Sequence, residues 1–407
     1  MTDPRPRRFH RTHQLALVLL LAVVTFAVAQ AWARRSAAPP ILPVPIVHPG
    51  PEPTPTPVVP IGEAKIEVAF VLDTTGSMSG LIEGAKQKIW SIANQMASSQ
   101  QKASLRVALI GYRDRGDAYV TRRFDLTEDI DSIYGHLRAF GAGGGGDTPE
   151  SVNQALREAV NDLSWSEDED VYKVVFLVGD APPHLDYPQD VQYQATARLA
   201  KQKDIVLNTI QCGSHPGTTP IWREIAGIGL GQYAAIAQDG GMVAMAAPMD
   251  EELATLNREL AATVVVYGGE EEKRRMAQKV KNSVDADAPA AASRLSYLSK
   301  VGGSVMSGMS DLVDAVKDGL ELDSLDAEVL PKPMRIMSPA EQKAYVGQKL
   351  EERGRIQTRI DELSGKRDLW VKAETERLRA EGHDDGFDGR VFETIKEQAA
   401  KKGIVYE

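Results

Sequence analysis

The feature that most constrains the fold is a series of short, predominantly apolar runs separated by helix-like stretches. Residues 68–72, VAFVL, show the pattern clearly. A strand that is buried on both faces has this composition, and strands that alternate with helices form a parallel sheet covered on both sides. Five such runs occur in order along the chain, at 66–72, 104–112, 172–178, 205–211 and 232–237.

A sixth strand is expected at residues 118–126, AYVTRRFDL. They follow the second run after a short turn at 113–117, and so close a return favours an antiparallel hairpin partner. The stretches between the runs carry apolar residues at helical spacing, and a last helix is expected at about 250–266. The sequence therefore predicts an α/β, doubly wound domain over residues 62–268. Its sheet is mostly parallel and six-stranded, with one antiparallel edge strand.

The amino terminus has the layout of a membrane-targeting segment, because several arginines precede an apolar run at 15–33. Such a run is nearly long enough to span a bilayer, and it can also be a cleavable secretory signal. We expect residues 1–37 to be a cytoplasmic basic tail and signal anchor of a single-pass protein in the cytoplasmic membrane. The later domains then lie in the periplasm, or are secreted if the signal is cleaved. The proline-rich residues 38–61 are expected to form a stiff linker.

The region after residue 268 carries weaker signals. A charged helix is expected at 270–281 and a linker at 285–293, within a helical and linker region at 269–337. A capping box at Ser338, with proline at the next position, predicts the start of a long charged helix in a C-terminal helical region at 338–407. Its apolar stripe favours a seam between packed helices, and self-association through these helices is a further expectation.

Composition excludes several classes of protein. The net charge of −10 argues against a nucleic-acid partner, because neutralising phosphates requires a basic surface. The single cysteine, Cys212, excludes an intramolecular disulfide and a zinc site built from cysteines. It ends an apolar run, so we expect it to be a small buried side chain.

The polar loops that follow the strands are predicted to meet at one edge of the sheet. In a parallel sheet covered by helices, ligands bind outside the carboxyl ends of the strands. Asp73, Thr75 and Ser77 follow the first strand and therefore lie at this edge. The loops after later elements return to the same edge and bring further acids, namely Asp114, Asp147, Glu150 and Asp180.

So many carboxylates raise one another's pKa unless a cation is bound. Hydroxyl and carboxylate oxygens, without cysteine or histidine, suit a hard ion such as Mg²⁺, Mn²⁺ or Ca²⁺. Asp73, Thr75 and Ser77 stand at alternate positions, and their oxygens are expected to turn toward one such ion. The alternative interpretation is a solvent-exposed acidic edge with ordinary turn chemistry.

The loop DTTGSMS at residues 73–79 resembles the Asp-x-Ser/Thr-x-Ser motif of the metal-ion-dependent adhesion site in the von Willebrand factor A family. The similarity extends over residues 66–266 in the order of the elements. The segments DTPE and DAPPH are similar to the corresponding loops in the A-type domains of integrin β-subunits. The resemblance implies a main ion, Mg²⁺ or Mn²⁺, whose ligands are Asp73, Thr75, Ser77, Glu150 and Asp180.

The chain departs from the family pattern in its glycine loop. Most members supply a metal-binding threonine where this chain has Gly146, and Thr148 is the fallback ligand. A further site of integrin β-subunits is not expected, because Gly80 and Leu81 stand where that site has acids.

The same resemblance implies a second ion, Ca²⁺, next to the first. Gly145 stands where the family has an asparagine ligand for it. Its remaining ligands correspond here to Asp114, Asp147, the carbonyl of Pro149, and Glu150. The residues expected to contact a partner at this edge are Arg113, Asp117 and His184.

The resemblance implies a binding module rather than an enzyme. A divalent ion with an incomplete set of ligands can accept an acidic side chain of a partner protein, so that binding depends on the metal. The alternatives are a metal-dependent hydrolase or phosphotransfer enzyme, since an exposed divalent ion can act as a Lewis acid, and an accessory partner of an ATPase complex. Against a phosphate-binding loop, the glycines at 143–146 lack a following Lys-Ser or Lys-Thr.

Overall fold

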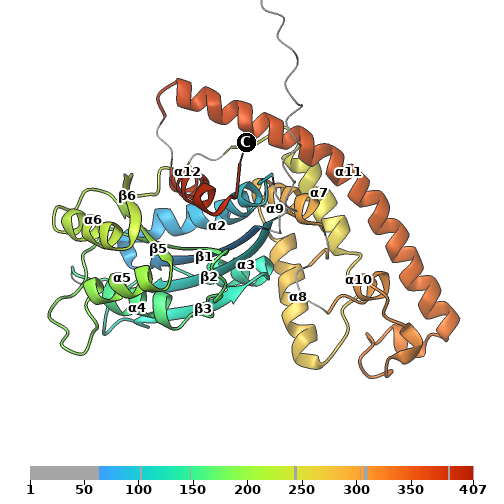
Figure 1. The fold of residues 1–407 in the computed structure, drawn as a ribbon. Helices are drawn as coiled ribbons and strands as arrows, with labels where there is room; N and C mark the ends of the chain where they lie inside the picture. Colours follow the sequence, from blue (N-terminus) through green and yellow to red (C-terminus); the bar gives the residue numbers. More distant parts are fainter. Residues whose placement is uncertain are drawn as a thin grey trace, which may run out of the picture. The chain divides into compact units, whose positions relative to one another are not determined.

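A six-stranded sheet forms the centre of the described structure (Figure 1). Its order is β3-β2-β1-β4-β5-β6, and every neighbouring pair is parallel except β2 and β3. The predicted mostly parallel sheet with one antiparallel edge strand is therefore confirmed. The strands are β1 (Ala64–Asp73), β2 (Ala103–Tyr112), β3 (Thr121–Thr127), β4 (Tyr172–Gly179), β5 (Ile205–Cys212) and β6 (Leu230–Ile236).

The computed structural model describes residues 64–100, 103–146, 148–242, 245–302, 304–306, 310–383 and 386–406. The predicted tail, membrane segment and linker at residues 1–61 lie outside this part of the chain. Within it, no helix combines the length and the apolar character needed to cross a membrane.

Side chains of the central strands alternate between two apolar layers, as the period of a strand requires. In β1, Phe70 and Leu72 face one layer, while Ala69 and Val71 face the other. The first layer is completed by α2 (Ser79–Met96) and α3 (Ile130–Arg138). The second is completed by α4 (Val152–Asn161), α5 (Tyr193–Gln202) and α6 (Thr218–Ile228). The sheet is thus covered on both faces.

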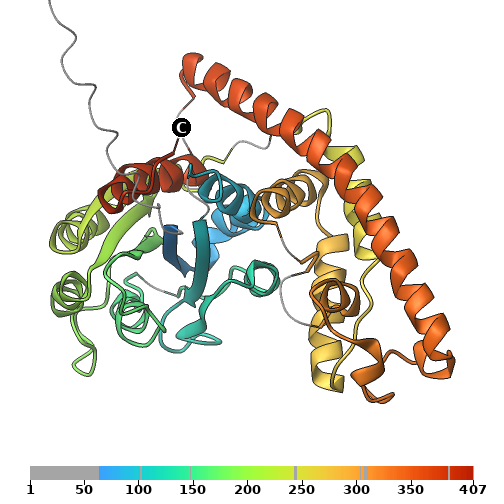
Figure 2. The same cartoon turned by 45° about the vertical axis from the view of Figure 1, so that its right-hand side comes forward.

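The rest of the described chain is helical, and Figure 2 shows α11 running across α7 and α9. Leu253 on α7, Met276 on α8, Leu295 on α9 and Ile360 on α11 belong to one buried apolar cluster. The helices are α7 (Asp250–Ala261), α8 (Glu270–Val284), α9 (Ala288–Val301), α10 (Leu312–Lys317), α11 (Pro339–Ala380) and α12 (Phe387–Ala399). Short 3₁₀ helices lie at η1 (Gly76–Met78), η2 (Leu322–Ser324), η3 (Met334–Ile336) and η4 (Ala400–Lys402).

The helices after residue 268 also pack against the sheet domain itself. The ring of Tyr297 on α9 lies 5.8 Å from that of Trp90 on α2, and Phe387 on α12 lies 6.2 Å from Phe70 on β1. All four side chains belong to the first apolar layer. The core therefore continues across the predicted boundary at 268, while the domain limits themselves stay a prediction.

The predicted linker at 285–293 is wrong, because these residues include the start of α9. The side chain of Asp287 caps this helix by accepting a hydrogen bond of 2.9 Å from the backbone N–H of Ala290, and Pro289 lies in the first turn. Capping aspartate and proline are both favoured at helix starts. The predicted capping box at Ser338 is confirmed, because the Glu341 side chain accepts from the Ser338 N–H at 2.7 Å.

Buried arginines tie these helices to one another and to the sheet domain. A buried charge is tolerated when it is paired and hydrogen-bonded, so each pair fixes how its two segments meet. The pairs are Arg294 with Asp131 at 2.8 Å, Arg367 with Asp250 at 2.6 Å, and Arg353 with Asp311 at 2.8 Å and Asp314 at 2.5 Å.

Candidate metal centre

The predicted metal ligands lie where the order of the strands reverses. From β1 the chain crosses to β2 on one side, and it later returns to β4 on the other side. Such a switch point opens a crevice at the carboxyl ends of the two strands, and ligands bind there. Asp73 ends β1, and Asp180 directly follows β4. The space is tight, because a Cβ on Gly179 would approach the Tyr112 hydroxyl to 2.4 Å and the Asp73 Cβ to 2.9 Å.

Asp73 is fully buried, and only one of its two carboxylate oxygens has a protein partner. Its Oδ1 accepts hydrogen bonds from the backbone N–H of Thr75 at 2.8 Å and from the Thr75 hydroxyl at 2.7 Å. Its Oδ2 has none. Burial raises the pKa of Asp73 to about 7, against the lowering effect of the Thr75 hydrogen bonds, and the negative charge of Asp180 raises it further.

The hydroxyls of Thr75 and Ser77 stand side by side next to this carboxylate, with 3.3 Å between their oxygens. The loop turns tightly here, because the 3₁₀ helix η1 begins at Gly76. The backbone N–H of Gly76 also donates to the carbonyl of Gly144 in the glycine loop at 3.3 Å. Because Asp73, Thr75 and Ser77 stand at alternate positions of this turn, one carboxylate and two hydroxyls lie close together.

Glu150 comes from the loop before α4 and is only 3% exposed. Its backbone is fixed by two hydrogen bonds to the loop after β4: its N–H donates to the Pro182 carbonyl at 2.9 Å, and its carbonyl accepts from the His184 N–H at 3.0 Å. In the described part of the chain, its Oε2 has no hydrogen-bond partner. Burial raises the pKa of Glu150 to about 9, and the nearby carboxylates of Asp73, Asp114, Asp117 and Asp180 add to this rise.

A pocket of about 350 Å³ opens in front of these groups. Gln238, which follows β6, closes one side, and its side-chain amide donates to Asp180 Oδ2 at 2.7 Å. Thr148 lies at the exposed side of the pocket. The structure thus brings five of the six predicted ligands of the main ion to one pocket, with Asp73 directly behind the Thr75 hydroxyl. The polar side chains that line it are those of Thr75, Ser77, Thr148, Glu150, Asp180, His215 and Gln238.

The donor set can be tested against a hard divalent ion. Within the described part of the chain, no three side chains of the His, Cys, Asp and Glu types are close enough together to hold a metal ion by themselves. Mg²⁺ does not require such a cluster, because it keeps several waters and is bound through one or two carboxylates. Two hydroxyls beside the unpartnered oxygens of Asp73 and Glu150 fit an ion of that kind.

The second predicted ion has less support from the geometry. Asp114 accepts hydrogen bonds from the Ser151 hydroxyl at 2.9 Å and the Tyr187 hydroxyl at 2.9 Å, and Nε2 of His184 lies 3.3 Å from its Oδ2. A cation would have to displace the two hydroxyl donors. Asp147 lies outside the described residues, and Pro149 is half-buried beside Glu150. The second ion stays a prediction.

The three residues predicted to contact a partner brace the loops of the site. Arg113 donates to the carbonyls of Thr74 at 3.0 Å and Gly141 at 2.6 Å. Asp117 accepts from the N–H of Gly145 at 3.1 Å, where the positive φ of 75° favours glycine. His184 is buried against Tyr187 and is bonded to Asp186 at 2.7 Å. Their contacts therefore hold the glycine loop and the loop after β4 in position.

Part of the chain matches a known protein family. Residues 67–246 match the family model described as the von Willebrand factor A domain. This part of the chain is a von Willebrand factor A domain. The matched residues contain most of β1, the other five strands, the loop at 73–79 and the pocket described above. Domains of this family are in general protein-interaction modules.

Individual relatives of the A domain are distant. A putative ariadne-like RING finger protein of Acanthamoeba polyphaga mimivirus is 30% identical over 125 residues, which are 30% of this chain and 12% of that protein. Proximal thread matrix protein 1 from the mussel byssus is 16% identical, with a TM-score of 0.32 over 44% of this chain and 43% of its own. The SpRpn10 VWA domain is 13% identical, with a TM-score of 0.33 over 43% of this chain and 89% of its own.

Sequence reasoning missed Gln238, Ser151 and Tyr187 at the A-domain site, and it interpreted His215 as a solvated histidine in a loop at this edge. Gln238 and His215 line the pocket, while Ser151 and Tyr187 hold Asp114. Gln238 and His215 follow β6 and β5, so the rule that loops after strands share one edge points to them. Ser151 and Tyr187 carry no comparable signal, because their contacts depend on how two loops fold against each other.

Proposed function

We propose that the A domain binds a protein partner through a divalent ion, Mg²⁺ or Mn²⁺, held at the carboxyl edge of the sheet. A carboxylate of the partner completes the ligands of the ion. The observation that carries this proposal is the pair of buried, unpartnered carboxylate oxygens, Asp73 Oδ2 and Glu150 Oε2, beside a pocket lined by hydroxyls.

Electrostatics supports a cation at this position. Burial and neighbouring acids disfavour the ionised form of both groups, which raises the pKa of Asp73 to about 7 and that of Glu150 to about 9. A divalent ion would favour the ionised form of both carboxyl groups, because it supplies the opposite charge at short range. Thr148 lines the pocket and is exposed, so an ion held there would be accessible to an external oxygen.

Catalysis is not part of this proposal. His215 lines the pocket, but its Nδ1 lies 3.1 Å from the Thr218 hydroxyl, and that hydroxyl donates to the Asp180 carbonyl at 2.8 Å. These contacts hold the His215 side chain in position within the loop after β5. A binding role for the ion needs no base or nucleophile.

We further propose that the A domain is displayed outside the cytoplasmic membrane. The support is the arginine-flanked apolar run at 15–33, which lies outside the described residues. The membrane then holds the chain through this run, or the domain is released if the run is cleaved as a signal.

Calorimetry on the full chain tests the metal site. We expect Mg²⁺ and Mn²⁺ to bind, and expect Asp73→Asn and Glu150→Gln to weaken binding by about tenfold or more, since each removes a ligand charge. Asp170→Asn is the matched control, because Asp170 is an exposed aspartate away from the site. Equal binding by all of these proteins would place any metal elsewhere and overturn the proposal.

The open position on the ion has its own test. Bound Mn²⁺ with an exchangeable water accelerates the relaxation of water protons. We expect acetate, a simple carboxylate, to reduce this acceleration in the Mn²⁺-loaded chain by displacing the water. An acceleration that acetate leaves unchanged would mean that no carboxylate reaches the ion.

A further inference from the structure

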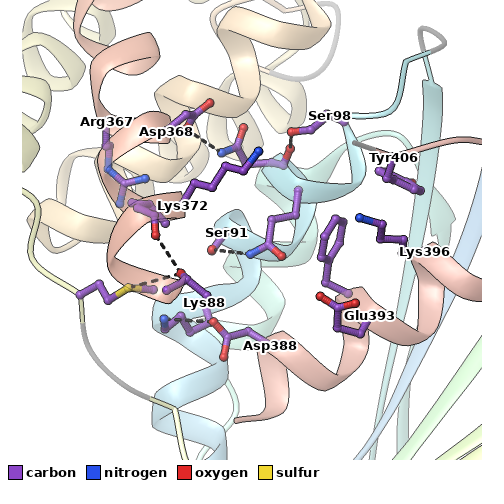
Figure 3. A pocket seen from close by; sticks show the side chains of 18 of the residues that line it. Lys88, Ser91, Ser98, Arg367, Asp368, Lys372, Asp388, Glu393, Lys396 and Tyr406 are labelled. Carbon is purple, nitrogen blue, oxygen red and sulfur yellow. Dashed lines mark hydrogen bonds and ion pairs between the residues drawn. The ribbon is translucent and has the colours of Figure 1, made fainter. Parts of the chain in front are cut away.

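A second, larger groove lies between α2, α11 and α12, away from the metal pocket. Its volume is about 1070 Å³, and Figure 3 shows side chains of all three helices around it. Along α2 it extends from Lys88 to Gln95 and continues past the end of the helix to Ser99, whereas the loop at 73–79 precedes the opposite end, at Ser79. Ligand pockets commonly measure 300–1,000 Å³, so the groove is large enough for an organic molecule.

Ion pairs connect the walls of the groove. Lys88 on α2 lies 3.0 Å from Asp388 on α12 (Figure 3), and Arg379 on α11 lies 3.1 Å from Glu393 on α12. Lys300, on α9, lies 2.7 Å from Asp368 on α11. These bridges hold the three helices in place around the open space. The groove is therefore part of the folded arrangement and does not depend on a ligand to form.

Several apolar side chains line the groove. Leu369 on α11 is 72% exposed. Val371 and Leu378 are half-buried and lie seven residues apart, which places them on one face of α11. Phe392 of α12 also lines the space. Apolar groups that border such a space favour a ligand with an apolar body.

One buried polar atom in the wall lacks a partner. Asn94 on α2 is 7% exposed, and its side-chain N–H donates to Asp368 Oδ1 at 3.2 Å. Its Oδ1 has no hydrogen-bond partner among the residues that the structure describes, and the residue lines the groove. Buried acceptors are normally satisfied, so this atom calls for a donor from a bound molecule.

The charge of the lining favours an anion. Six lysines and arginines line the groove against four aspartates and glutamates, and one of the six, Arg367, is paired with Asp250, which does not line the groove. An excess of one positive charge remains, in a chain whose net charge is −10. Lys372 on α11 lines it and makes no ion pair with any side chain in the described part of the chain. We propose that this groove binds an organic anion that has a broad apolar body and a hydrogen-bond donor.

A fluorescent probe with these properties tests the proposal on the full chain. Toluidinonaphthalene sulfonate is an anion with aromatic rings and an N–H donor, and its emission rises in apolar surroundings. We expect saturable binding that Lys372→Gln weakens about fivefold, as the loss of one partly exposed charge predicts. Thr375→Trp fills the groove from α11, and we expect it to weaken binding about tenfold or more, because the indole takes the volume of the ligand.

Matched controls lie on the same helix. Lys366→Gln and Thr358→Trp change exposed residues of α11 that do not line the groove, and both should leave binding unchanged. Absence of saturable binding, or equal affinity in Thr375→Trp and Thr358→Trp, would overturn the proposal. So would dimerisation of the chain that Thr375→Trp abolishes, since the occupant would then be a second copy.

Discussion

Carboxylates are buried in two regions of the described structure. In one region they are paired with arginines, and in the other they keep an oxygen without a hydrogen-bond partner. Among the C-terminal helices, Asp250 and Asp311 are each paired with a buried arginine. At the edge of the sheet, Asp73 and Glu150 are equally buried, yet each keeps one oxygen without a partner. Burying a charge without compensation is unfavourable, so the first arrangement serves structure and the second leaves room for a cation. Four predictions can break or sharpen this comparison.

The largest effect is expected from removing a structural arginine. Arg353→Met leaves Asp311 and Asp314 buried without their cation, and burial already raises the pKa of Asp311 despite Arg353. We expect a loss of about 3–5 kcal/mol in the free energy of unfolding, measured by urea denaturation. Arg355→Met, on the exposed side of the same helix, is the control. A loss below about 1 kcal/mol would show that these carboxylates tolerate burial unpaired.

The same kind of change at the sheet edge should have the opposite sign. In EDTA at pH 8, Glu150→Gln replaces a carboxyl whose ionisation is disfavoured with a neutral amide, and we expect a gain of roughly 2 kcal/mol in stability. Glu167→Gln, an exposed change, should have no effect. Destabilisation by Glu150→Gln without metal would mean that this carboxylate is structural, and the contrast between the two regions would fail.

The pH dependence of stability should reveal the same two groups. Their folded pKa values, about 7 for Asp73 and about 9 for Glu150, lie above the ordinary values of 3.8 and 4.5. The unfolded chain therefore binds fewer protons between these limits, and the stability that the two protonated groups contribute is lost as pH rises toward 7 and 9. We expect the melting temperature in EDTA to fall by several degrees between pH 5 and pH 9.

Mg²⁺ should remove most of this fall, because metal binding displaces the protons. The double variant Asp73→Asn with Glu150→Gln should also show a flatter profile, with or without metal. A wild-type profile in EDTA that parallels the double variant would contradict the prediction.

The smallest effect is expected at Asp114, which lies at the sheet edge but is satisfied by protein donors. Tyr187→Phe removes one of these donors, and we expect a loss of about 1 kcal/mol in stability with Mg²⁺ affinity unchanged. Calorimetry with Ca²⁺ and Asp114→Asn then separates the two interpretations of this residue. Loss of a distinct Ca²⁺-binding event would restore the second ion and move Asp114 into the metal-binding group.

The sequence predicts the centre of the sheet well because the four central strands, β2, β1, β4 and β5, are largely buried. A continuous apolar run such as that of β1 favours a buried strand over other local structures. The order of such strands then determines which loops meet at one edge of the sheet. Asp73, Thr75 and Ser77 could be predicted for the same reason, since they directly follow such a run. The edge strand β3 is shorter than expected, because Val120 already belongs to the turn, where its carbonyl accepts from the Arg113 N–H at 2.9 Å.

Contacts between separate loops could not be predicted. Tyr187 reaches Asp114 across 73 residues, and Gln238 reaches Asp180 across 58. No local pattern encodes such contacts, because they depend on the final position of both loops. The linker predicted at 285–293 failed for a different reason: Asp287 and Pro289 suit both a linker and the first turn of a helix.

The packing of α2 has a consequence for modularity. Ten of its 18 residues are buried, around most of the helix, because α9 and α12 cover the side that does not face the sheet. A fragment that ends after α7 would present Trp90 and its neighbours to water. If this A domain were moved into another protein without the later helices, α2 would need other residues to cover it. The unit that can be exchanged between proteins therefore includes the helices that follow the A domain in the chain.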